Sequence, residues 1–406
     1  MNSGLQVETP RAELGRKALS GFFLSGLLMS FVGAILPAWG YHLGSEFSIA
    51  GSYFLSLNAG IIVSVRLGRE LLARKETAFV LAAAAALACG AFLFLSTVSP
   101  PSPVWLRVFG VFWLGVSAGL LNSAVFHAIS PIYQQEPAAT VNLGGMLFGL
   151  GCFITALLVA ATYYVFTVPA ILVLLAMVPL LFTVIYAKSR FPSAPAPDTP
   201  SKEVAADFRK PLAVLFSLLL FLQFGNEWAI AGWLALFLNQ RLGISPASSL
   251  LLLALYWLAL MVGRLAAQSI LPRVSHAKLL MGSVVAALFG LLILSFTDNR
   301  FGAVVAILTV GAGFAPIYPL VVEKIGARFS YYHPGYYNGI FSIAVTGGLL
   351  APFLLGYLAD QWGIRIVMLL PLAGTCLVFF LLLLISLEAK LSGVGGMPSE
   401  VKSASG

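Results

Sequence analysis

Twelve runs of roughly twenty apolar residues follow one another between Ala18 and Glu388. The hydrocarbon core of a bilayer is about 30 Å thick and a helix rises about 1.5 Å per residue, so a spanning helix needs roughly 20 mostly apolar residues. The runs therefore predict an all-α, multi-pass membrane protein. The predicted spans are 18–40, 48–68, 77–98, 104–128, 140–163, 167–188, 211–238, 246–270, 277–296, 301–323, 337–358 and 363–388.

The composition excludes a soluble protein of this length, because 60% of the 406 residues are hydrophobic and only 9% are charged. The net charge of +8 comes from basic residues at the ends of spans, and therefore indicates orientation rather than nucleic-acid binding. Cytoplasmic loops of membrane proteins are enriched in Lys and Arg. A cytoplasmic N-terminus places 19 of the 23 Lys and Arg residues inside and leaves Arg107, Arg241, Arg300 and Arg365 outside. The protein is therefore predicted to lie in a cell membrane, inner or plasma, with both termini in the cytoplasm.

A polar, proline-rich segment at 189–210 separates the twelve spans into two sets of six. We interpret it as a cytoplasmic linker whose second half forms a short surface helix. The predicted organisation is a cytoplasmic N-tail at 1–17, an N-terminal half at 18–188, the linker at 189–210, a C-terminal half at 211–388 and a cytoplasmic C-tail at 389–406.

The two sets of six resemble each other. Val116-Ser117-Ala118-Gly119 matches Val310-Gly311-Ala312-Gly313, and Asn142 precedes Gly151 by nine residues as Asn338 precedes Gly347. Matches at corresponding helices predict two pseudo-symmetric six-helix halves. In transporters built from such repeats, the solute site lies near mid-membrane between them.

Several short pieces occur in a recognisable order and spacing. They are Gly119-Leu120-Leu121-Asn122, Gly225-Asn226-Glu227, Gly263-Arg264, Pro316-Ile317-Tyr318-Pro319 and Thr346-Gly347-Gly348. With them the chain resembles the fucose, glucose and galactose permease branch of the major facilitator superfamily. The resemblance implies the major facilitator fold and a secondary active transporter or facilitator. It would move a small polar solute, sugar or sugar-like, by alternating access.

The chain departs from that branch at residues that bear on coupling. Proton-coupled members are expected to carry carboxylates in helices 1 and 4, where Gly33 and Asn122 stand here. Phe126 replaces a polar residue one turn further along, which leaves an amphipathic or drug-like solute as the rival class. The usual acidic residue before the basic cluster after span 2 is also missing.

Glu227 lies near the middle of span 211–238, where an ionisable side chain costs about 3 kcal/mol on insertion scales. Gln223, Asn226 and Glu227 are spaced at i, i+3 and i+4 and are expected to share one helix face. Two interpretations remain open. This polar stripe faces a central cavity, where Glu227 accepts solute hydroxyls or carries a coupling proton, or it forms a hydrogen-bonded packing contact with a neighbouring helix.

The other candidates also have structural alternatives. Asn122 and Asn58 either bind solute or bond between helices, and Tyr318 marks either a cavity-lining break or a tolerated kink. Trp228 and Trp233 offer flat surfaces to a sugar ring. The candidate solute-binding residues are Glu227, Asn226, Gln223, Asn122, Asn58, Tyr318 and Trp228, and the candidate gating residues are Asn142, Asn338, Arg66, Arg264 and Arg273.

The sequence shows no catalytic constellation, no phosphate-cradling GxxxxGK[ST], no HExxH and no zinc-ligand spacing. We therefore expect no enzyme, cofactor, metal, nucleotide or nucleic-acid partner. The expected partners are a small solute, a coupling proton in the symport version, and the lipid bilayer, with the monomer as the functional unit. A membrane sensor that binds solute without transporting it is the alternative of a different class.

Overall fold

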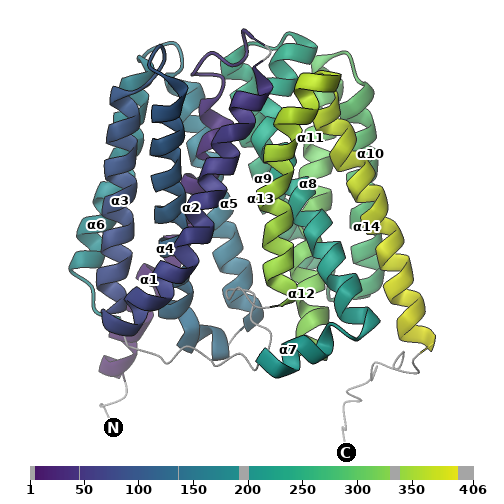
Figure 1. Cartoon of the computed structure of the whole chain (residues 1–406). Coiled ribbons are helices and arrows are strands. Elements are labelled where there is room, and N and C mark those ends of the chain that lie inside the picture. The colour runs from purple at the N-terminus through teal and green to yellow at the C-terminus, as the bar shows by residue number, and fades with distance from the viewer. Residues whose placement is uncertain (1–4, 45, 136, 192–200, 330–338, 392–406) are drawn as a thin grey trace, which may run out of the picture.

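The computed structural model describes residues 5–44, 46–135, 137–191, 201–329 and 339–391. The described residues contain twelve helical segments long and apolar enough to cross a membrane, which confirms the predicted all-α fold (Figure 1). The helices are α1 (Leu5–Ile35), α2 (Phe47–Arg74), α3 (Thr77–Thr97), α4 (Val104–Gln135), α5 (Pro137–Thr162), α6 (Val168–Ala187), α7 (Ser201–Asp207), α8 (Pro211–Leu242), α9 (Pro246–Ile270), α10 (His276–Phe296), α11 (Arg300–Phe314), α12 (Ile317–Arg328), α13 (Ile340–Trp362) and α14 (Ile366–Leu391).

Proline explains two helix boundaries. The first helix ends at Ile35 rather than at the predicted residue 40, because Pro37 lacks a backbone N–H and Gly40 adopts a positive φ of 87°. The tenth span, Arg300–Arg328, is divided at Pro316 into α11 and α12. The predicted break near Tyr318 therefore exists, two residues before that tyrosine.

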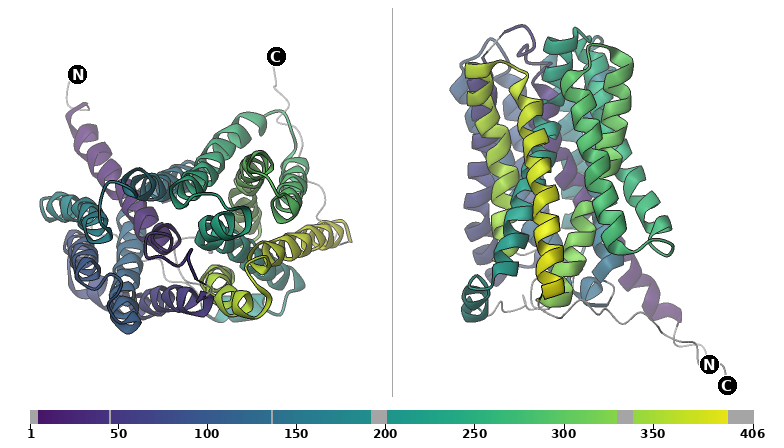
Figure 2. Two further views of the ribbon diagram at one scale, coloured as in Figure 1. Left: turned by 90° about the horizontal axis from the view of Figure 1, so that it is seen from above. Right: turned by 90° about the vertical axis from the view of Figure 1, so that its right-hand side faces the viewer.

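The spanning helices form two groups that stand side by side, α1 to α6 on one side and α8 to α14 on the other (Figure 2). Helix α1 begins and α14 ends at the same end of the bundle, which we call the terminal end (Figure 1). The α1–α2 connection lies at the opposite, distal end. Helix α7 lies at the terminal end, within the half of 189–210 where a short helix is expected, and residues 192–200 of that segment lie outside the described part of the chain.

Small residues bring helices of the N-terminal half into close contact. A Cβ on Gly60 of α2 would collide with the carbonyl of Phe112, and one on Gly115 of α4 would collide with the carbonyl of Leu57. Lipid tails are as apolar as leucine, so such close backbone packing rather than hydrophobicity holds membrane helices together. The Gly115-x-x-x-Gly119 spacing thus serves the packing of α2 against α4.

The two halves are joined at the distal end by hydrogen bonds to backbone groups. The Asp360 carboxylate at the end of α13 accepts from the backbone N–H groups of Phe47 and Ser48 at the start of α2, both at 2.9 Å. The Gln240 amide on α8 donates to the carbonyls of Gly44 at 2.8 Å and Tyr41 at 3.2 Å. These contacts close the distal end between the halves.

Arg107 is buried in the distal part of the N-terminal half rather than exposed in a loop, with 5% of its surface accessible. Its Nε donates to the Tyr53 hydroxyl at 2.8 Å, and its guanidinium lies 5.8 Å from the centre of the Trp39 ring. A cation over an indole face is attracted by the ring quadrupole. This group fastens α2 to α4.

Candidate functional site

A cavity of about 260 Å³ lies between the two halves, lined by α1, α2, α4 and α5 on one side and by α8, α9, α12 and α13 on the other. One water needs only roughly 10–15 Å³ by the same kind of measure, so the cavity has room for a small molecule. Its lining includes Val141 and Phe341, which lie near the beginnings of α5 and α13, at the terminal end. The cavity thus extends from mid-membrane towards that end.

The cavity is closed towards the distal end by close contact between α1, α2 and α8. A Cβ on Gly33 would collide with the Ala231 carbonyl, so a helix 1 carboxylate has no room at this position. Trp233 is fully buried, and its indole N–H donates to the Pro352 carbonyl at 2.9 Å. Its ring packs on Phe54 with centroids 5.9 Å apart. Trp233, considered as a sugar-stacking residue, instead forms part of this seal.

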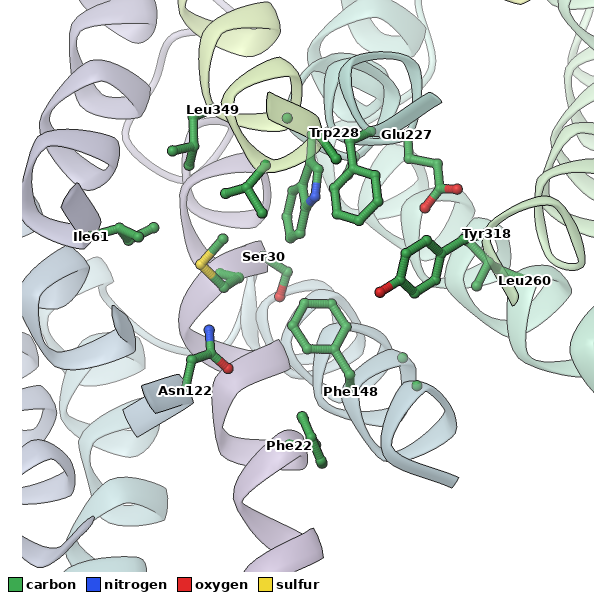
Figure 3. A pocket seen from close by; sticks show the side chains of 18 of the residues that line it. Phe22, Ser30, Ile61, Asn122, Phe148, Glu227, Trp228, Leu260, Tyr318 and Leu349 are labelled. Carbon is green, nitrogen blue, oxygen red and sulfur yellow. The ribbon is translucent and has the colours of Figure 1, made fainter. Parts of the chain in front are cut away.

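Glu227 lines the cavity from the middle of α8, and Figure 3 shows it on the same side of the cavity as Tyr318. Its Oε1 accepts a hydrogen bond of 2.8 Å from Gln223 Nε2. Gln223 is fully buried and does not line the cavity. Gln223 therefore positions the carboxylate from behind, and Glu227 presents it to the cavity.

Asn226 lies outside the cavity lining, and the expectation of one shared polar face needs correction here. Its Nδ2 donates to Thr375 Oγ1 of α14 at 3.2 Å, within the C-terminal half. A helix turns by about 100° per residue, so Asn226 points about 100° away from Glu227 although both lie within one turn of Gln223. For Asn226, the structure shows the packing contact that was the alternative interpretation.

Replacing Asn226 by Ala should weaken packing more than solute binding. Hydrogen bonds between membrane helices contribute about 0.6 kcal/mol on average. We expect a double-mutant cycle of Asn226→Ala and Thr375→Val, measured by reversible unfolding in detergent micelles, to give a coupling energy of about 0.6 kcal/mol. A large loss of solute affinity with an unchanged free energy of unfolding would return Asn226 to the site.

Aromatic side chains make up much of the cavity wall. The Trp228 ring meets Phe148 of the opposite half edge-on, with centroids 6.0 Å apart, and Tyr318 meets Phe224 at 5.1 Å. On the N-terminal side Phe126 packs edge-on against Phe22 at 5.1 Å, and both line the cavity. Trp228 and Tyr318 are thus placed where a solute ring could contact them.

Asn122 and Asn58 also line the cavity from the N-terminal half. Asn122 Oδ1 accepts from Ser25 Oγ at 2.8 Å, and Figure 3 shows its amide across the cavity from Tyr318. Asn58 Nδ2 donates to the Leu349 carbonyl of α13, a contact between the two halves. Asn58 therefore bonds between helices, as one interpretation expected, and its place on the cavity wall leaves solute binding as a prediction.

The candidate gating residues fall in different places. Arg66 and Arg273 are exposed at the terminal end, and Asn142 contacts Met146 Sδ at 3.7 Å one turn along α5. Arg264 lines the central cavity rather than its terminal edge. Asn338 lies outside the described residues.

Sequence reasoning missed the cavity position of Arg264. Helical side chains point towards the N-terminus of their helix, and α9 runs from the distal to the terminal end. A long side chain near the end of α9 therefore reaches back towards mid-membrane. The same rule, applied to the predicted span 246–270, would have predicted that the Arg264 side chain reaches the cavity.

Comparison with known proteins identifies the family. Residues 18–348 match the sequence model of the Major Facilitator Superfamily, and the chain belongs to that family. It is 22% identical over 341 residues to an uncharacterised MFS-type transporter of Yersinia pestis, covering 84% of this chain and 87% of the relative. A glucose/galactose transporter of Brucella abortus is 27% identical over 165 residues, 39% of each chain.

Solved structures share the fold. The nucleoside transporter NupG, in a mutant form, superposes with a TM-score of 0.72 at 13% identity, covering 92% of this chain and 99% of that chain. The fucose:proton symporter FucP of E. coli gives a TM-score of 0.62 at 14% identity, covering 93% and 99%. The family match and the twelve apolar helices together make the chain a multi-pass membrane transporter of small solutes and not an enzyme.

Proposed function

We propose that this protein moves a small polar solute, sugar or sugar-like, across the membrane by alternating access. The supporting observation is one cavity between two six-helix halves, closed at the distal end and extending to the terminal end, with a carboxylate near its middle. Such a site between two repeats is the arrangement from which rocking of one half against the other exposes a solute to either side. The structure then represents the state open towards the terminal end.

Two features support a hydroxylated solute. Glu227, Asn122 and Ser30 place hydroxyl-binding groups on opposite walls of the cavity. The names of three similar proteins give a substrate: glucose and galactose, fucose, or nucleosides. All of these solutes bear several hydroxyl groups. The aromatic walls formed by Phe22, Phe126 and Phe148 favour a second candidate, a solute that joins such groups to a flat apolar ring.

A thermal-shift screen of the purified protein tests both candidates. A ligand that binds only the folded state stabilises it by about 2.7 kcal/mol at 100 times its Kd. We expect D-glucose, D-galactose, L-fucose or uridine to raise the Tm, while organic acids of similar size leave it unchanged. A shift produced only by large amphipathic compounds would contradict the sugar-like proposal and support a drug-like solute.

The sidedness of the terminal end is a separate proposal. The charge distribution supports a topology in which both termini and the segment 189–210 lie in the cytoplasm, with the protein in the plasma membrane. A cysteine at Leu43, in the exposed α1–α2 connection, should react with an impermeant maleimide added to intact cells, and one at Lys75 should not. The reverse labelling pattern would show that the topology is inverted and would contradict this proposal.

A further inference from the structure

Two charged side chains, Glu227 and Arg264, occur among the described residues that line the cavity. Glu227 comes from α8 and Arg264 from α9 of the same half. Arg264 is close enough to interact electrostatically with Glu227, Tyr318 and Tyr256, yet it makes no ion pair with a carboxylate of the described residues. Its buried Nε has no hydrogen-bond partner in this part of the chain.

A glycine of the opposite half makes room for the guanidinium. A Cβ on Gly145 of α5 would collide with Arg264 Nη1. One turn further along α5, a Cβ on Gly149 would meet Met261 Cγ at 2.8 Å. Arg264 therefore lies at the contact between α5 and α9, where the two halves face each other.

The unpaired charge requires a physical explanation. Arg264 is half-buried, so its guanidinium loses part of its hydration, which is costly for an ion without a partner. A guanidinium has five N–H donors, which water or a solute in the cavity has to satisfy. Gln223 occupies one oxygen of Glu227, and no ion pair joins that carboxylate to Arg264. A solute hydroxyl fits both groups at once, because its oxygen accepts from the guanidinium while its hydrogen is donated to a carboxylate.

We propose that Arg264 is a solute-binding, specificity-determining residue that donates hydrogen bonds to a solute oxygen while Glu227 accepts from a solute hydroxyl. The inference rests on the proposed function and adds a residue to its site. The two charges balance, so the pair favours a neutral hydroxylated solute over a charged analogue of similar shape. Gly145, which has no side chain, leaves the space that the guanidinium occupies.

Binding measurements test the role of Arg264. The probes are D-galactose with its acid D-galacturonate, and uridine with uridine 5′-monophosphate, each titrated against the full-length protein by calorimetry. We expect the wild type to prefer the neutral member of a pair, and Arg264→Gln to weaken binding of that neutral solute about tenfold, the loss of one charged hydrogen bond. Arg264→Lys should weaken binding of the neutral solute by less than Arg264→Gln does. Glu227→Gln should shift the preference towards the anionic member.

The two glycines supply a matched control for variants that fold. Gly145→Ala should displace the guanidinium and weaken binding of the neutral solute several-fold, whereas Gly149→Ala, which presses on the flexible Met261 side chain, should leave affinity within about twofold. Equal effects at both positions would indicate a general packing defect. Unchanged affinity in Arg264→Gln would overturn the proposal.

A measurement without solute separates this inference from the proposed function. With the three native cysteines replaced by alanine, Val345→Cys places a thiol in the cavity wall. We expect the ratio of its reaction rates with anionic and cationic methanethiosulfonates to fall about tenfold in Arg264→Gln, because the charge acts in a partly water-excluded space. An unchanged ratio would overturn the placement of Arg264. If the wild type binds none of the four solutes, the proposed function fails for these classes, and the reagent ratio alone decides on Arg264.

Discussion

Replacing Glu227 by Gln should leave counterflow exchange of the solute in proteoliposomes intact but remove any response of uptake to a pH gradient. Glutamine keeps a hydrogen-bond acceptor beside Gln223, so exchange should persist with a several-fold weaker affinity. The glutamine side chain, however, cannot bind and release a proton, so the response to a pH gradient should disappear. Among the described residues that line the cavity, Glu227 is the one carboxylate.

The wild type itself should respond weakly to a pH gradient. One pH unit is worth about 1.4 kcal/mol, so strict one-to-one proton coupling gives about tenfold accumulation. We expect about twofold or less, because Gly33 and Asn122 stand at the two positions where the resemblance to the permease branch implies acids. Gly33 is pressed against the backbone of α8, and Asn122 is bonded to Ser25.

Glu70→Gln is the matched control, since Glu70 is an exposed carboxylate on α2 away from the cavity. It should change neither exchange nor the pH response. Full tenfold accumulation in Glu227→Gln would place the proton site elsewhere and contradict this view of the residue. Loss of counterflow in Glu227→Gln, with the protein still monodisperse, would show that the negative charge itself is needed to hold the solute.

The fold could be predicted from the sequence because, in a bilayer, the length and order of the apolar runs along the chain determine the helices. Every backbone polar group must be satisfied within the segment, so an apolar run of sufficient length has to be a helix. Run length and order therefore predicted twelve spans, and the structure contains them. The boundary error at Ile35 arose because hydropathy continues past Pro37, whereas the helix does not.

The site was less predictable because it depends on direction and on distant contacts. Spacing alone put Asn226 and Glu227 on one polar face, yet their side chains point about 100° apart and contact different neighbours. Arg264 was predicted to be a gating residue, although the length and direction of its side chain carry it into the central cavity. Contacts between the halves, such as Asp360 with Phe47, join residues 313 positions apart. No local pattern in one sequence shows such a contact.

The contact of Asp360 with α2 should control how readily the distal end opens. Both carboxylate oxygens accept from N–H groups in the first turn of α2, where unsatisfied donors and the helix dipole favour a negative charge. This contact joins the C-terminal half to the N-terminal half and has to break when the halves separate there. It therefore stabilises the state in which the cavity extends to the terminal end.

Asp360→Asn should raise the population of the distally open state relative to the closed one. Hydrogen bonds to charged groups contribute about 1.5–3 kcal/mol and neutral ones about 1, so losing the charge should cost about 1–2 kcal/mol, roughly a tenfold change in the ratio of the two states. Spin labels at Leu43 and Phe301 should report it, because these side chains are 83% and 79% exposed at the distal end, one on each half. Electron–electron double resonance should then show a longer distance component in the variant.

Asp298→Asn provides the control for that measurement. Asp298 pairs with Arg241 at the same end of the molecule, but both residues belong to the C-terminal half, so breaking this pair should leave the label distances unchanged. An equal shift in both variants would mean that any loss of negative charge at the distal end loosens it. If Asp360→Asn leaves the distances as they are, the glycine contact between Gly51 and Gly356 and the hydrogen bonds of Gln240 hold the halves together without Asp360. Opening would then be governed by backbone packing, which is insensitive to charge.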